Sequence, residues 1–133
     1  MPLTPAERLE IRELYARYCH AIDDGDGAAW AECFVRDGSF VPGIGAARGT
    51  SIVGREALAA FGADARRGAI GRIVTTNLAL YEGDGTVTGR CYGMLVEVRD
   101  GRPELVASVV YHDELEREDG AWRFRSRRPR RDH

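Results

Sequence analysis

The sequence contains no lysine: all 19 of its basic residues are arginine, set against 21 acidic residues for a formal charge of −2. It also contains no run of about 18 apolar residues, which excludes a membrane-spanning helix. Its three cysteines form no C-x-x-C pair and cannot all pair within one chain. We therefore interpret them as reduced, buried thiols.

Motifs for common cofactors are missing as well. The three histidines are scattered, without the spacing of metal ligands. Neither Gly43-x-Gly45 nor Gly83-Asp84-Gly85 is part of a phosphate-binding pattern between a strand and a helix. We therefore expect a protein without metal or cofactor. The N-terminal segment has neither a basic start nor an apolar stretch, so we expect no secretory signal and a cytoplasmic location.

With 133 residues, 44% of them hydrophobic and 30% charged, the chain has the composition of an ordinary folded protein. We expect a single domain over 1–133 with one core. The segment 123–133 holds six arginines and one aspartate, and its order beyond Arg128 stays open. The rest is acidic and has no stripe of basic residues interleaved with aromatics, so we expect no nucleic-acid partner and no membrane partner.

The first half has helical periodicity. Thr4, Pro5 and Glu7 make a capping box with proline at the first helical position, which predicts the start of a helix. Turn formers at 23–27 end it. Shorter helices are predicted near 28–34 and 55–67, with a strand at 39–41 and a glycine-rich loop at 42–49 between them. The buried stripe of the first helix is predicted to be Ile11, Leu14, Tyr15, Tyr18 and Ile22.

The second half changes to strand periodicity, with hairpin turns between the runs. Helices followed by an antiparallel meander favour an α+β fold, in which a strongly bent sheet wraps around the helices. The predicted strands are 72–82, 86–99, 104–117 and 121–128.

Several segments together resemble a known family. They are the opening helix with Ala21-Ile22-Asp23-Asp24-Gly25-Asp26, the pair Trp30 and Phe34, the Thr76-Asn77 pair, and Tyr111-His112-Asp113-Glu114-Leu115 with Gly120-Ala121-Trp122. In this order and spacing they resemble a SnoaL-like domain of the nuclear transport factor two-like superfamily, over nearly the whole chain.

The resemblance implies a cone of three N-terminal helices packed on a curved, mainly antiparallel sheet, with an apolar pocket inside. Members of the family include scytalone dehydratase, steroid isomerase and polyketide cyclases, and also non-catalytic subunits of dioxygenases. The resemblance also implies a homodimer or homotrimer. It does not by itself fix an activity.

Asp23 matches the aspartate that pairs with a histidine in the family's dehydratases and abstracts a proton beside a leaving group. Tyr18 corresponds to a tyrosine that acts on the leaving oxygen. The alternatives stay open: Asp23 is also suited to hydrogen-bonding the turn at Gly25, and a tyrosine on an apolar stripe is usually part of the core. The family's histidine position is occupied by Ile73, which can neither accept nor relay a proton.

His112 is the histidine placed to replace the missing base. Strand alternation puts Val106, Ser108, Val110 and His112 on one face, and the resemblance implies that this is the pocket face. The alternative is a histidine near the surface at the end of a strand.

Further ligand contacts are expected from a mixed set of residues. Glu97 shares a strand face with Cys91, and a Glu97–Asp23 pair in an apolar pocket would separate the two carboxyl pKa values. The alternative is a solvated Glu97 carboxylate close to the hairpin turn. Asn77 either orients a ligand or bonds to the backbone. The expected contacts are Trp30, Ile73, Asn77, Cys91, Glu97 and Val110.

These observations lead to two functional hypotheses. The first is a cofactor-independent lyase or isomerase, with dehydration preferred, that acts on a hydrophobic polycyclic or polyketide-like molecule through Asp23, Tyr18 and His112. The second is a non-catalytic ligand-binding or assembly module, because Ile73 replaces the usual base.

Overall fold

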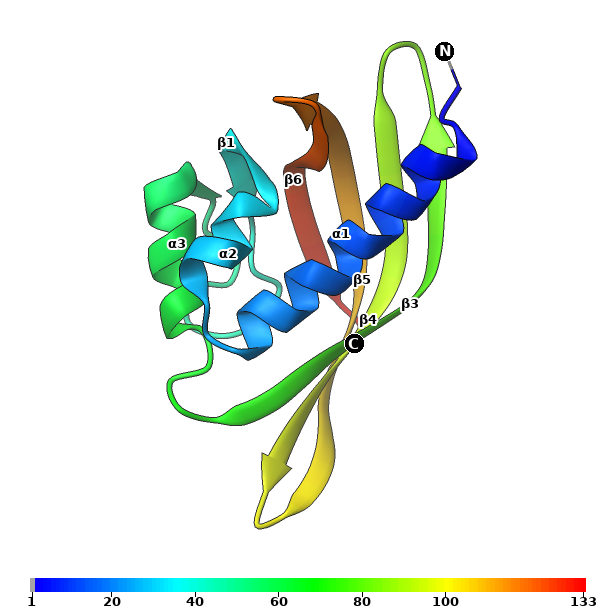
Figure 1. The fold of residues 1–133 in the computed structure, drawn as a ribbon. Coiled ribbons are helices and arrows are strands. Elements are labelled where there is room, and N and C mark those ends of the chain that lie inside the picture. Colours follow the sequence, from blue (N-terminus) through cyan, green and yellow to red (C-terminus); the bar gives the residue numbers. More distant parts are fainter. Residues whose placement is uncertain (1) are drawn as a thin grey trace.

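A computed structural model describes residues 2–133. Three helices cover one face of a six-stranded sheet, as Figure 1 shows. The elements are α1 (Pro5–Asp23), α2 (Gly27–Glu32), β1 (Phe34–Phe40), β2 (Ile52–Val53), α3 (Arg55–Asp64), β3 (Ile70–Glu82), β4 (Val87–Arg99), β5 (Arg102–Glu118) and β6 (Ala121–Arg131). The predicted α+β class and its curved, mostly antiparallel sheet are confirmed.

The strand order is β2-β1-β6-β5-β4-β3. All neighbours are antiparallel except β1 and β6, which run parallel with Phe34 opposite Phe124. Helix α1 crosses the face of the sheet, and α2 and α3 stand side by side next to β1 (Figure 1). In this strand order neither β1 nor β6 lies at an edge of the sheet, because β2 and β3 occupy the two edges.

The hairpin turns follow from their sequences. Asp100-Gly101 and Asp119-Gly120 each form a two-residue turn in which both residues have positive φ, between 51° and 80°. This is the type I′ geometry that suits the twist of antiparallel strands and favours Asp-Gly. The hairpins predicted at these places are confirmed.

The capping box at the start of α1 is also confirmed. Thr4 Oγ1 accepts from the Glu7 backbone N–H at 3.1 Å, and the Glu7 carboxylate accepts from the Thr4 N–H at 3.2 Å. The buried face of α1 contains every residue of the predicted stripe, together with Cys19 and Ala21.

Several element boundaries differ from the prediction. Helix α2 ends at Glu32, and β1 begins at Phe34, because the backbone N–H of Phe124 donates to Cys33 O and starts the pairing with β6. The two-residue strand β2 was not predicted. Strand β6 continues to Arg131, where it pairs with Val109 of β5.

The core between helices and sheet is rich in aromatic side chains. Trp30 and Phe34 are fully buried, with ring centroids 5.0 Å apart, and Phe40 lies 5.2 Å from Trp30 at nearly a right angle. Edge-to-face contacts of this kind add to the gain from burial. The three cysteines are free and buried, as predicted. Among residues 2–133, no helix combines the length and apolar character needed to cross a membrane.

Candidate functional site

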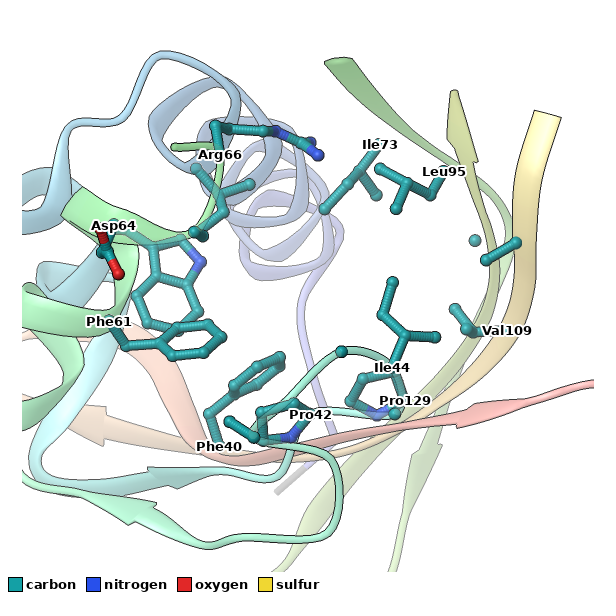
Figure 2. A pocket seen from close by; sticks show the side chains of 18 of the residues that line it. Phe40, Pro42, Ile44, Phe61, Asp64, Arg66, Ile73, Leu95, Val109 and Pro129 are labelled. Carbon is teal, nitrogen blue, oxygen red and sulfur yellow. The ribbon is translucent and has the colours of Figure 1, made fainter. Parts of the chain in front are cut away.

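The helices and the sheet enclose a cavity of about 690 Å³ between them. Figure 2 shows Phe40, Pro42, Ile44 and Phe61 on one side of it, with Ile73, Leu95 and Val109 on the strand side. Because its wall is mostly apolar and aromatic, the cavity suits a hydrophobic ligand. The segment that follows β1 supplies Pro42 and Ile44, so the predicted glycine-rich loop is part of the wall.

Asp23, the last residue of α1, is held by two residues that line this cavity. The guanidinium of Arg66 forms a short ion pair with its Oδ1, and the backbone N–H of Ile73 lies 3.2 Å from both carboxylate oxygens. The Asp23 side chain is only 7% exposed, and Arg66 and Ile73, rather than Asp23, line the cavity. The carboxylate therefore lies behind Arg66.

Tyr18 lines the cavity and is 1% exposed. Tyr111, on β5, lines the same wall, with its ring centroid 6.3 Å from that of Tyr18. Burial is the main cause that raises the pKa of both phenols above the ordinary value of 10.0. Both tyrosines therefore remain protonated at neutral pH and are able to donate a hydrogen bond.

A buried ion pair lies directly behind these tyrosines. Arg127 Nε donates to Asp113 Oδ1 at 2.9 Å, and both side chains are 0% exposed. The hydroxyl of Tyr15 donates to the other Asp113 oxygen at 2.6 Å. The guanidinium carbon lies 3.8 Å from the ring centroid of Tyr111 and 4.3 Å from that of Tyr18. Burial disfavours the charged guanidinium, but Asp113 and the tyrosines hold the pKa of Arg127 above its ordinary value.

The predicted pocket face of β5 is wrong. His112 is exposed and Val110 is half-buried, and both point away from the cavity, which is lined instead by Ala107, Val109 and Tyr111. The paired strands place His112 between Arg90 and Arg128 on the outer face. The alternative of a surface histidine therefore describes His112.

Of three other predicted contacts, two lie outside the cavity wall. Asn77 is exposed and has a φ of 58° at a bulge in β3, outside the cavity wall. Cys91 is buried behind the wall, with its Sγ 3.4 Å from Arg127 Nη2. Glu97 does line the cavity, but its carboxylate pairs with Arg99 at 2.7 Å and not with Asp23.

Trp30 and Ile73 line the cavity where the prediction placed them. Arg66 and Tyr111 are among the polar lining residues that the prediction missed. For Tyr111 a signal existed, because the odd-numbered positions of β5 include Val109, Tyr111 and Leu115. Arg66 follows α3 in a segment of small and charged residues without periodicity, and so gave no signal.

Comparisons with known proteins agree with this architecture. Residues 4–128 match the model of a SnoaL-like domain. A protein of unknown function from Mycobacterium tuberculosis is 37% identical, with a TM-score of 0.84, and the match covers 96% of this chain and 73% of that chain. Aln2 from a Streptomyces species is 28% identical, with a TM-score of 0.84 over 99% of this chain and 95% of the other.

A protein from Catenulispora acidiphila, solved in complex with S-DNPA, is 28% identical, with a TM-score of 0.80 over 97% of this chain and 96% of the other. A comparison with curated protein sequences found no match. The family match spans nearly the whole chain and agrees with the cone-shaped fold and its cavity. The chain therefore belongs to the SnoaL-like domain family of the nuclear transport factor two-like superfamily.

Proposed function

We propose that this protein is a cofactor-independent lyase or isomerase that acts on a small hydrophobic molecule of polycyclic or polyketide-like character. The observation that carries the proposal is the mostly apolar cavity of about 690 Å³ with an aspartate, Asp23, ion-paired to the Arg66 that lines it. The family includes polyketide cyclases and dehydratases, and the relative solved with S-DNPA holds a small molecule.

In the proposed dehydration, the Asp23 carboxylate accepts a proton from a carbon next to a carbonyl group. The electron pair of that C–H bond forms a C=C bond, the neighbouring C–O bond breaks, and the hydroxyl leaves as water with a proton from Tyr18. The proton on Asp23 returns to Tyr18 through solvent, so the protein ends unchanged. His112 has no part in this reaction, because it lies on the outer face.

The test uses a panel of β-hydroxy ketones built on naphthalene and anthracene frames, with products separated by chromatography. Asp23→Asn should lower turnover by about a hundredfold or more, the range typical of lost acid–base catalysis. The matched control is Asp24→Asn, which changes the exposed neighbour and should leave turnover unchanged. Equal turnover in the Asp23 variant and wild type would contradict the proposed role.

A second candidate function is binding without catalysis. It is favoured by Ile73 at the family's base position and by the two partners that hold Asp23. This candidate predicts that panel compounds bind and are recovered unchanged after long incubation. Conversion by wild-type protein that Asp23→Asn abolishes would exclude it.

A further inference from the structure

Arg66 pairs with Asp23 and also forms part of the cavity wall. Its side chain is 13% exposed and lines the cavity, and Figure 2 shows its guanidinium turned toward Ile73. Gly71 leaves room for it: a Cβ on Gly71 would lie 2.9 Å from Arg66 Nη1. A cation is thus accommodated in the wall of a mostly apolar cavity.

The hydrogen-bond donors of this wall are not all used. Arg66 Nε and Trp30 Nε1 are both buried, and neither finds a partner within residues 2–133. Both residues line the cavity. Buried donors in folded proteins are normally paired, and a guanidinium has five N–H donors to satisfy. A ligand that complements this wall must therefore bring acceptor atoms.

Arg66 is paired with Asp23 through Nη2, and the acidic groups of the wall are paired with exposed arginines. Asp64 pairs with Arg67 at 3.4 Å, and the Arg67 side chain is 77% exposed. Glu97 pairs with Arg99. Among the charged side chains of the wall, Arg66 alone combines burial with an unpartnered donor in the described chain.

We propose that Arg66 binds an acidic oxygen of the ligand, an enolate or a phenolate, and exchanges Asp23 for that oxygen when the ligand enters. This inference rests on the proposed function and narrows the substrate class to enolisable or phenolic ring compounds. An arginine suits such an oxygen because its planar fork donates charge-assisted hydrogen bonds. The exchange also uncovers the Asp23 carboxylate, which otherwise lies behind Arg66.

The test compares two probes of nearly the same shape by calorimetric titration. They are 2-hydroxy-1,4-naphthoquinone, which is an anion at neutral pH, and its neutral 2-methoxy analogue. Wild-type protein should bind the anion at least about tenfold more tightly, as expected of one charge-assisted contact. This preference should disappear in Arg66→Gln and persist in Arg67→Gln, which removes the exposed arginine of the same wall that pairs with Asp64.

The affinity of Asp23→Asn for the two probes separates a ligand-binding Arg66 from one that only supports the fold. Because this substitution removes the competing charge, it should tighten binding of the anion and leave the neutral probe unchanged. Equal affinity of wild type for both probes, or a preference retained in Arg66→Gln, would overturn the inference while leaving cavity binding intact. Failure of both probes to bind would overturn the inference together with the proposed function.

Discussion

Removal of one partner from the Arg127–Asp113 pair should destabilise the protein strongly. Asp113→Asn keeps the shape of the side chain and an oxygen for the Tyr15 hydroxyl, but it leaves the fully buried guanidinium without a counter-charge. Breaking a buried ion pair on one side costs about 3–5 kcal/mol. The whole free energy of unfolding of a domain is about 5–15 kcal/mol, so this loss is a large fraction of it.

The double variant makes the prediction specific. Asp113→Asn combined with Arg127→Met removes both charges, and the sum of the two single losses should exceed the loss in the double variant by about 2 kcal/mol. Unfolding in urea, followed by circular dichroism, gives each free energy, and equal slopes confirm comparable transitions. Strict additivity of the two substitutions would refute the view that Asp113 compensates Arg127.

Three further outcomes are expected. Gly27→Ala should lower the free energy of unfolding by about 1–3 kcal/mol or more, because the added Cβ would lie 2.0 Å from the backbone oxygen of Ala59; Gly83→Ala is the control in urea unfolding. The Glu7 carboxylate accepts a hydrogen bond from Trp122 Nε1, and this bond is the main cause that lowers the pKa of Glu7 from 4.5. The stabilisation that the carboxylate contributes is therefore complete above pH 4.5 and is lost as the pH falls through the lower pKa of the folded state. Glu7→Gln should therefore destabilise at pH 6 and progressively less toward pH 2, whereas a pH-independent difference would contradict this. Burial raises the thiol pKa of Cys33 to about 11 and of Cys91 to about 12, so at pH 8 Ellman's reagent should label native protein far more slowly than unfolded protein, and rapid native labelling would argue against burial.

Local signals in the sequence were sufficient for much of the fold. The capping box at Thr4 and the Asp-Gly turns each depend on a few neighbouring residues, so the start of α1 and two hairpins could be read directly. Strand β2 could not be predicted in this way, because two residues are too short for periodicity and are held in place by pairing with β1.

The site was harder to predict, because its decisive contacts join distant parts of the chain. Asp113 lies on the inner face of β5 and is neutralised by Arg127 of β6, and without knowledge of that pairing a charged residue indicates the solvent face. Strand alternation groups His112 correctly with Ser108 and Val110, but it does not say which of the two faces meets the helices, so the wrong face was assigned to the pocket. The contact between Arg66 and Asp23 spans 43 positions and follows no motif.

The parallel pairing of β1 with β6 has a consequence for how the molecule assembles. As the ribosome makes the chain, β1 emerges early, but its long partner is the last strand to appear. Until then β1 has only the two-residue β2 beside it, and a two-stranded ribbon is marginal in water. The helical half is thus expected to wait for the end of the chain, which makes closure of the cone a late and cooperative event in biosynthesis.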